Sequence, residues 1–529
     1  MRIDPPALQG LDPRRLRAMA RGIEKESLRV TPAGLLATTP HPQALGSALT
    51  HPHITTDYSE AQLELITGVH HDPEACLREL REIHQFTFEA LQASGPRESE
   101  GVGELLWPAS MPATLPAQED QIPIGRYGRS NVGQAKSVYR MGLAWRYGRR
   151  MQTISGIHYN WSMPGVDSAQ YFALIRNFRR HAFLLLYLFG ASPALCACFV
   201  QGREHALQRL SDGSLYLPHA TSLRMGRLGY QSEAQASLAV SYNGLDGYAA
   251  SLQEALTRPY PAYEALGIRG PDGAYRQLAT SLLQIENEFY GTIRPKRSIF
   301  PGERPLHALR ERGVEYVEVR LLDLDPFEPL GIGTDTMRVI DAFLLYCLLA
   351  PSPDDSPDEI ARIGRNQQRV AAQGREPGLL LEGEAGPVSL RDWGHALLAA
   401  CEPIAALLDR AGGEEGRHAQ ALAQARLALD DPARLPSARV LQALAQDHGN
   451  DFLAFGVHRS RLARDWVLAQ PWDAESQAHF QAMSAQSVRE QVRIEAADTL
   501  PFEQYRQQYI APERLGLGRG AIAPGLTAA

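Results

Sequence analysis

Cysteine is scarce in this chain, with five residues among 529: Cys76, Cys196, Cys198, Cys347 and Cys401. The number is odd, no two form a Cys-x-x-Cys pair, and most lie inside apolar runs. This usage argues against a disulfide scaffold and favours a reducing compartment, so we expect a cytoplasmic protein. Cys196 and Cys198 lie in the apolar segment 194–200, which favours small buried side chains over metal ligands.

Long apolar runs and a strong charge imbalance are also missing. The longest mainly apolar stretch, 182–200, is interrupted by Gly190, Ser192 and Pro193, and the part before Gly190 is shorter than the ~20 residues that a membrane-spanning helix needs. The first residues lack the apolar core of a signal peptide. The formal net charge is −7, from 53 basic and 60 acidic residues. We therefore expect neither a nucleic-acid nor a membrane partner.

Glycine-rich nucleotide-binding loops are absent as well. The segment GRSNVG at 128–133 is followed by Gln-Ala-Lys rather than by the Lys-Ser/Thr of a Walker A loop. No dinucleotide-binding fingerprint is present either. Any bound nucleotide would have to be held by other means, such as cations bridging its phosphates to carboxylates.

Four short segments do carry a clear pattern, because they alternate polar and apolar residues with a period of two: 22–30, 61–67, 156–162 and 314–321. Residues i and i+2 share one face of a strand, so each segment predicts a strand with one polar face. The polar residues are Glu24 and Glu26, Gln62 and Glu64, His158 and Asn160, and Glu318 and Arg320. Such a sheet face suits hard cations and phosphate. Spacing alone leaves open that each strand merely shows its polar side to water.

Helices are predicted elsewhere in the chain, and they make up nearly all of its C-terminal third. Apolar periodicity and capping signals predict helices over 73–93, 168–189, 248–256 and 274–290, and then over 336–349, 355–373, 390–410, 416–429, 437–447, 452–469 and 473–498. Composition changes near residue 330. We predict a sheet region with active-site loops over 1–330, a mainly helical region packed on it over 331–514, and a flexible tail over 515–529.

Nine segments give a more specific signal by their order: RGIEKE (21–26), ITTD (54–57), RYGRSN (126–131), MQTISGIHYN (151–160), LFGASP (188–193), ATSLR (220–224), QIENE (284–288), IRPKR (293–297) and EYVEVR (315–320). This series resembles the proteobacterial type of glutamate–cysteine ligase, also called γ-glutamylcysteine synthetase. The resemblance implies an α/β fold of the glutamine-synthetase-like type, with a curved, mostly antiparallel sheet, helices packed outside it and a helical C-terminal third.

The resemblance also implies an activity. ATP would phosphorylate the γ-carboxylate of glutamate, and the amino group of cysteine would displace phosphate, which gives γ-glutamylcysteine in the first step of glutathione biosynthesis. Magnesium is the expected cofactor, and the single imidazole among the ligands suits Mn²⁺ too. The expected partners are small-molecule substrates, and the expected assembly is a monomer.

Residue roles follow from the same resemblance. The expected metal ligands are Glu24, Glu26, Asp57, Glu64, His158 and Glu318. Arg140, Arg294, Lys296 and Arg320 would bind ATP, and Arg320 and Glu318 would be the catalytic residues. Arg224 would hold the α-carboxylate of glutamate, with Gln152 and Ile154 lining that subsite from one face of a strand. Tyr58, Tyr139, Tyr230 and Tyr290 would surround cysteine, Tyr58 standing where a phenylalanine is expected.

Three alternatives use similar residues: a γ-glutamyl ligase with another amine acceptor, a two-metal hydrolase, and a relative that binds without catalysis. Glu318 and Arg320 together with Arg224 argue against the last two, because a hydrolase has no need for an α-carboxylate clamp.

Overall fold

The computed structural model describes residues 8, 10–94, 103–229, 233–236, 238, 240–413 and 416–516. Tyr230 and residues 517–529 of the predicted tail lie outside this part of the chain. Within the described residues, no helix is both long and apolar enough to cross a membrane.

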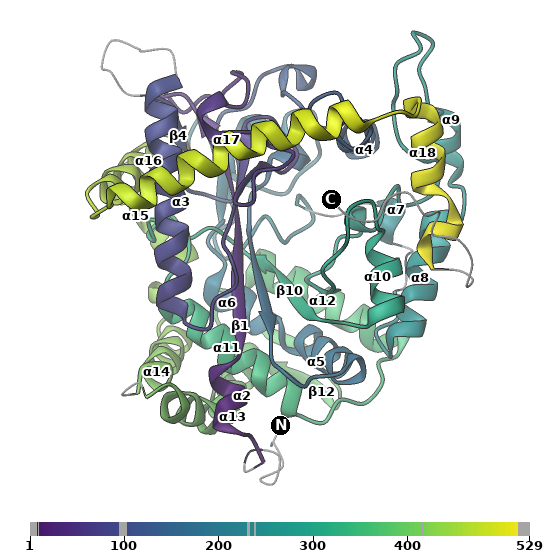
Figure 1. Ribbon diagram of the computed structural model, residues 1–529. Coiled ribbons are helices and arrows are strands. Elements are labelled where there is room, and N and C mark those ends of the chain that lie inside the picture. The colour runs from purple at the N-terminus through teal and green to yellow at the C-terminus, as the bar shows by residue number, and fades with distance from the viewer. Residues whose placement is uncertain are drawn as a thin grey trace.

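A central antiparallel sheet holds the four predicted strands as direct neighbours (Figure 1). Its strand order is β2-β3-β1-β5-β10-β9, and β4 pairs with β1 beside this path. The bounds are β1 (Ala20–Val30), β2 (Ile54–Thr56), β3 (Gln62–Ile66), β4 (Leu105–Leu106), β5 (Ile157–Ser162), β9 (Ile293–Lys296) and β10 (Tyr316–Leu322). The expected α/β fold with a mostly antiparallel sheet is confirmed.

The apolar side of this sheet faces a large hydrophobic core. Ile23 on β1, Tyr159 and Trp161 on β5, and Val317 and Val319 on β10 are all buried in one cluster. The alternation that predicted the strands thus separates an apolar face from a polar face, as the period of two requires. We call the side that carries Glu24, Glu26, Glu64, His158, Glu318 and Arg320 the polar face.

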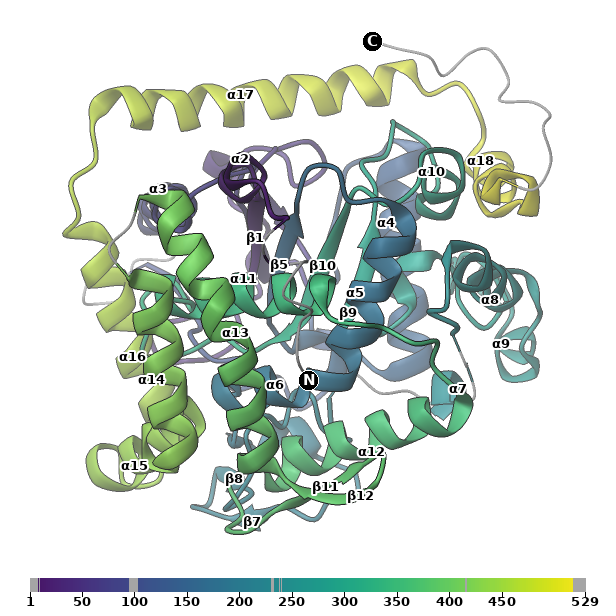
Figure 2. The ribbon, with the colours of Figure 1, turned by 90° about the horizontal axis from the view of Figure 1, so that it is seen from below.

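Helices pack against the apolar side of the sheet and around its edges (Figures 1 and 2). They are α2 (Pro13–Arg17), α3 (Pro73–Ser94), α4 (Asn131–Tyr147), α5 (Ser168–His181), α6 (Phe183–Phe189), α7 (Glu233–Ala236), α8 (Leu245–Thr257), α9 (Pro261–Leu266), α10 (Pro305–Arg312), α11 (Thr334–Leu349), α12 (Pro357–Gln373), α13 (Leu390–Gly412), α14 (Arg417–Asp430), α15 (Pro436–Asp447), α16 (Phe452–Leu468), α17 (Ala474–Ala497) and α18 (Phe502–Ile510). The helical C-terminal region is confirmed. Two small sheets complete the fold: β6 (Ala194–Cys196) with β8 (Ser214–Tyr216) and β7 (Gln208–Arg209), and β11 (Leu380–Gly383) with β12 (Gly386–Ser389).

The same hydrophobic core contains side chains from both sides of residue 330, among them Ile23, Phe343 and Cys401. Helix α11 contributes strongly to this core after residue 330, because every residue from Met337 to Cys347 is buried. The division of the chain near residue 330 therefore stays a prediction.

Helix α17 runs across the molecule and links two loops that lie far from it in sequence (Figure 1). Near its middle, Ser487 Oγ accepts a hydrogen bond from the backbone N–H of Ser47 at 2.9 Å. Near its end, Glu495 Oε1 accepts the backbone N–H of Arg129 at 2.8 Å. The carboxylate of Asp498 then accepts the N–H of Asn131, the first residue of α4.

Two helix predictions need correction. The helix predicted over 168–189 is divided into α5 and α6 at Ala182. Residues 274–290 are not a helix, apart from a short 3₁₀ turn, Glu286–Glu288. Side chains satisfy the backbone there, because Gln284 Oε1 accepts the N–H of Leu278 at 2.9 Å and Glu288 Oε2 accepts the N–H of Gln284 at 2.7 Å. Such local bonds compete with helical ones.

A buried ion pair links the sheet to α11, and its loss should destabilise the fold. Arg21 Nη2 lies 2.9 Å from Asp341 Oδ2, with both side chains at most 3% exposed, and the Tyr159 hydroxyl donates to Asp341 Oδ1 at 2.8 Å. We expect Asp341→Ala to lower the free energy of unfolding by about 3–5 kcal/mol, because it leaves a buried guanidinium without its counter-charge. Urea denaturation measures this. Glu254→Ala, which breaks the exposed pair with Arg258, should change it only slightly, and equal losses in the two variants would contradict the prediction.

Candidate functional site

The polar face brings acidic side chains from neighbouring strands together around one histidine. Cross-strand pairing sets Glu24 opposite His158 and Glu26 opposite Glu64. His158 Nδ1 lies 3.1 Å from Glu24 Oε2 and 3.9 Å from Glu318 Oε1, while its Nε2 lies 3.5 Å from Glu26 Oε1. The imidazole of His158 on β5 therefore lies between carboxylates of β1 on one side and a carboxylate of β10 on the other.

This crowding changes the acidity of the carboxylates. Burial, together with the nearby charge of Asp57, raises the pKa of Glu26 to about 8. Burial and the charges of Glu24, Asp57 and Glu26 raise the pKa of Glu64 well above its ordinary value. Like charges in a poorly solvated space disfavour ionisation, so a bound cation would stabilise the ionised forms.

The geometry and chemistry of this group fit such a cation. Glu24, Glu64 and His158 each offer one ligand atom, and the three atoms lie within 4.8 Å of one another. Carboxylate oxygens are the ligands that Mg²⁺ prefers, and a single imidazole is compatible with Mn²⁺. Asp57, which directly follows β2, and Glu26 lie close enough to influence Glu64 electrostatically.

A cationic group borders this acidic cluster on β9 and β10. Lys296 Nζ lies 3.1 Å from Glu318 Oε1, Arg320 Nη1 lies 3.0 Å from Glu318 Oε2, and Arg294 Nη1 lies 4.0 Å from the same oxygen. Burial acts to raise the pKa of Glu318, but the positive charges of Lys296 and Arg320 hold this pKa well below its ordinary value. The structure thus brings together three of the four residues that were predicted to bind ATP.

Arg140, the fourth of these residues, lies on α4 beside the end of β2. Its Nε donates to the carbonyl of Asp57, its Nη2 donates to the carbonyl of Thr56 at 3.3 Å, and its guanidinium lies 4.5 Å from the centre of the Tyr127 ring. The structure therefore places Arg140 next to the candidate metal ligand Asp57, and its phosphate contact stays a prediction.

Arg224 lies in a loop and is only 1% exposed. Its Nη2 donates to the carbonyl of Arg320 at 2.9 Å, so the loop contacts β10 beside the cationic group. A Cβ added to Gly156 would lie 2.1 Å from the same nitrogen, which means that the guanidinium fits only because residue 156 is glycine. The N–H of Gly156 donates to Glu26 Oε2 at 2.8 Å. Sequence reasoning missed Gly156, although it begins one of the four alternating segments.

The prediction that Gln152 and Ile154 share one face of a strand is wrong. Residues Met151–Thr153 form a 3₁₀ turn, because the N–H groups of Thr153 and Ile154 bond to the carbonyls of Arg150 and Met151 instead of to a neighbouring strand. The carbonyl of Ile154 accepts a hydrogen bond from Gln62 Nε2 at 2.9 Å. Gln152 Nε2 donates to the hydroxyl of Tyr290 at 3.1 Å, so Gln152 contacts one of the tyrosines predicted to surround cysteine.

The predicted tyrosines cluster beside α4, except for Tyr230, which lies outside the described residues. Tyr139 lies on α4, and its carbonyl accepts from Gln284 Nε2 at 3.2 Å. The Tyr58 side chain is buried, and its hydroxyl has no hydrogen-bond partner among the described residues. Tyr147, also on α4, sets its ring edge-on to that of Tyr290, with 6.0 Å between centroids.

Glu288 fixes this cluster and was given no role by the sequence reasoning. It forms an ion pair with Arg146 at 2.8 Å, with both side chains fully buried. Its Oε1 also accepts from the hydroxyl of Tyr147 at 2.7 Å. The sequence feature that could have identified Glu288 is its place in the segment QIENE at 284–288.

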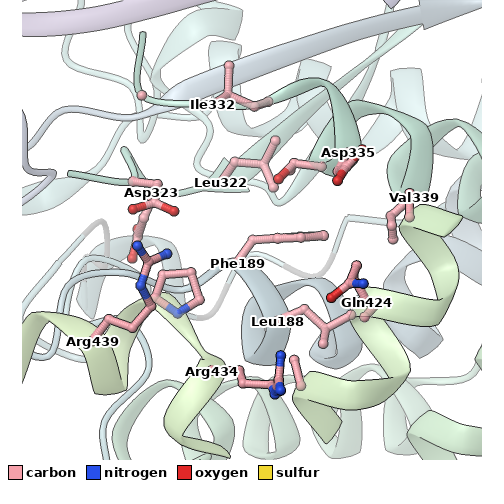
Figure 3. A pocket seen from close by; sticks show the side chains of 17 residues that line it. Leu188, Phe189, Leu322, Asp323, Ile332, Asp335, Val339, Gln424, Arg434 and Arg439 are labelled. Carbon is pink, nitrogen blue, oxygen red and sulfur yellow. The ribbon is translucent and has the colours of Figure 1, made fainter. Parts of the chain in front are cut away.

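A cavity of about 230 Å³ lies elsewhere, between the end of β10, α11, α14 and the start of α15 (Figure 3). Its lining includes Leu322, Asp323, Asp335, Gln424 and Arg439, and none of the residues predicted for the site. The polar face, rather than this cavity, is the candidate functional site.

Comparison with known proteins agrees with this geometry. A sequence model of the family described as glutamate–cysteine ligase matches residues 9–370. The glutamate–cysteine ligase of Bordetella bronchiseptica is 49% identical over 509 residues, which cover 93% of this chain and 94% of that protein. The glutamate–cysteine ligase of Azotobacter vinelandii is 48% identical over 527 residues, which cover 96% of each chain.

Solved structures agree as well. A crystal structure of glutamate–cysteine ligase from Francisella tularensis in complex with AMP superposes with a TM-score of 0.86 and 35% identity, and covers 94% of this chain and 98% of that one. A bifunctional glutathione synthetase from Pasteurella multocida shares the fold, with a TM-score of 0.68 and 24% identity over 89% of this chain and 57% of that one. With the matching family over more than half of its length, close relatives along nearly all of it and the same fold, the chain belongs to the glutamate–cysteine ligase family.

Proposed function

We propose that this chain joins the γ-carboxylate of glutamate to the amino group of cysteine while ATP is converted to ADP and phosphate, the first step of glutathione biosynthesis. Family membership supports this reaction, and AMP bound to the Francisella relative supports a nucleotide substrate. The observation that carries the proposal is that one sheet face holds both a ligand set for a divalent cation and a cationic group around Glu318, with the buried Arg224 of a loop bonded to β10 beside them.

The chemistry requires activation of a carboxylate. Transfer of the γ-phosphoryl group of ATP to a γ-carboxylate oxygen of glutamate gives γ-glutamyl phosphate and ADP. The amine of cysteine then attacks the acyl carbon, loses a proton, and expels phosphate as the amide bond forms. Both steps develop negative charge on phosphate oxygens, which positioned cations stabilise.

We infer that Mg²⁺, or Mn²⁺ in its place, is held by Glu24, Glu26, Asp57, Glu64, His158 and Glu318. When bound, the cation would neutralise charge on the phosphate oxygens. Arg320 shares a strand face with Glu318, so it can contact the phosphoryl group during transfer. Arg294, Lys296 and Arg140 would hold the remaining phosphates of ATP.

The amino-acid substrates would occupy the two ends of this face. A guanidinium can bind a carboxylate through two parallel hydrogen bonds, so Arg224 would hold the α-carboxylate of glutamate, with Ile154 beside it. Tyr58, Tyr139, Tyr230 and Tyr290 would surround the side chain of cysteine, with Gln152 orienting Tyr290. The buried hydroxyl of Tyr58 gives this chain an additional donor toward that substrate.

We also infer a cytoplasmic monomer that acts as one catalytic unit. The sparse cysteines support a reducing compartment, since Cys76, Cys347 and Cys401 are buried and unpaired. The core shared by residues before and after 330 supports a single unit formed by regions 1–330 and 331–514, and this core also contains Leu515, the first residue of the predicted tail 515–529.

The reaction is tested directly with purified protein, ATP, Mg²⁺ and a panel of amines. We expect ADP to form rapidly only when glutamate and cysteine are both present, because the acyl phosphate needs an amine to complete the cycle. Measuring ADP and the dipeptide together checks this, and other amines should react more slowly. ATP hydrolysis at the full rate in the absence of both amino acids would contradict the assignment of this protein as a ligase.

Loss of a single negative charge from the polar face should weaken cation binding. We expect Glu318→Gln and Glu26→Gln each to reduce turnover by about 100-fold or more, since electrostatic groups at transferring phosphates contribute on this scale. Steady-state rates across a Mg²⁺ titration measure the effect, and circular dichroism confirms folding. Glu315→Gln is a matched control, because Glu315 precedes the same strand but contacts Arg297 and Ser298. Wild-type rates at low Mg²⁺ in both site variants would mean that these carboxylates hold no cation.

Arg224→Lys should raise the glutamate requirement selectively. An ammonium group cannot reproduce the two parallel bonds of a guanidinium, so we expect the KM for glutamate to rise about 10- to 150-fold, which corresponds to about 1.5–3 kcal/mol. The KM values for ATP and cysteine should change little. Kinetics with each substrate varied separately, and Arg258→Lys as a surface control, provide the measurement. A uniform change in all three constants would remove Arg224 from the glutamate subsite.

A further inference from the structure

Asp323 lies directly behind Arg224 and is bound on several sides. It is 4% exposed. Its Oδ2 accepts the backbone N–H of Ala191 at 2.9 Å and the hydroxyl of Ser192 at 2.6 Å, and its Oδ1 accepts the hydroxyl of Ser222 at 3.0 Å. The same Oδ1 lies 3.9 Å from Arg224 Nη1. A buried carboxylate, held by three donors, thus faces the guanidinium.

An irregularity in β10 brings Asp323 to this position. Val319 pairs with Tyr159 and Leu322 pairs with Ile157, so β10 has one residue more than β5 between these two pairs. The extra residue reverses the alternation. Leu322 consequently faces the core with Ile157, and Asp323 returns to the side of Glu318 and Arg320. Strict alternation in the sequence would have put Asp323 on the apolar side.

Both terminal nitrogens of Arg224 are held by this arrangement. The carbonyl of Arg320 accepts from Nη2 in the space that Gly156 leaves free, and Asp323 attracts Nη1. A buried guanidinium without a counter-charge is costly and tends to reorient toward other acceptors. Asp323 supplies such a counter-charge before any substrate carboxylate arrives, in addition to Glu26, whose carboxylate also interacts with Arg224.

We propose that Asp323 is a positioning residue that fixes the guanidinium of Arg224 and thereby selects an acid substrate that carries an α-carboxylate. This inference rests on the proposed role of Arg224 in binding glutamate. Asp323 would not touch the substrate, and its effect would be confined to the substrate group that Arg224 binds.

A purely structural role is the competing explanation, because Asp323 also braces residues 191–192 and 222 and borders the cavity of Figure 3. The two roles differ in what they do to a substrate without an α-carboxylate. 4-Aminobutanoate is such a probe, since it is glutamate with the α-carboxylate removed. Its affinity can be measured as an inhibition constant against glutamate, so that it need not turn over.

The test compares Asp323→Asn with the unaltered enzyme. We expect the KM for glutamate to rise about tenfold, the scale of a lost interaction with a charged group. The KM values for ATP and cysteine, and the inhibition constant for 4-aminobutanoate, should change little. Ser222→Ala, which removes one of the donors that orient Asp323, should give a smaller change with the same selectivity, and it replaces Asp323→Asn as the test if that variant does not fold.

Asp325→Asn is the matched control, because this carboxylate follows two residues later but accepts from the N–H of Phe327 at 2.9 Å; it should leave the glutamate KM unchanged. Equal losses with glutamate and 4-aminobutanoate, or no loss with either, would overturn the positioning role. Arg224→Lys is measured in parallel. If that variant does not distinguish the two compounds, the assignment of Arg224 itself fails; if it does while Asp323→Asn does not, only the role of Asp323 fails.

Discussion

Repulsion among buried and half-buried carboxylates is the constraint on which the rest of this structure depends. Glu24, Glu26 and Glu64 come from adjacent strands and face the same side, where burial already disfavours their charge. The fold can hold them together only because the other side of the sheet is fastened to a large core. On the polar side, the flanking strands β9 and β10 add Lys296 and Arg320, which balance Glu318. The negative charge that remains on this face favours the binding of a divalent cation.

Much of this arrangement could be predicted from the sequence. A period of two fixes which residues share a face, so the composition of the polar face followed from the strands. The order of those strands did not, because pairing between segments as distant as 157–162 and 316–322 depends on packing. The sequence also predicted the wrong local structure in two segments, a strand at 152–154 and a helix at 274–290. In both, backbone N–H groups form hydrogen bonds other than those of the predicted strand or helix.

The residues that sequence reasoning missed act on neighbouring side chains of the protein. Gly156 matters because of an atom that it lacks, which leaves room for a guanidinium from residue 224. Glu288 matters because its buried carboxylate binds both the buried guanidinium of Arg146 and the hydroxyl of the half-buried Tyr147. Asp323 was hidden by a single inserted residue in β10 that reverses the alternation. None of these relations has a periodic signature, so only the folded chain reveals them.

The attachment of α4 to the segment that follows α17 has a consequence for the order in which the protein matures. All the residues predicted for the site precede residue 321, yet the helix that carries Tyr139 and Arg140, α4, is bonded at its first residue by Asp498 and the carbonyl of Leu500. Arg129, just before this helix, is bonded by Glu495. During synthesis these partners leave the ribosome after more than nine-tenths of the chain. A nascent chain can therefore form its central sheet early, but it completes the support of this helix only at the end of translation.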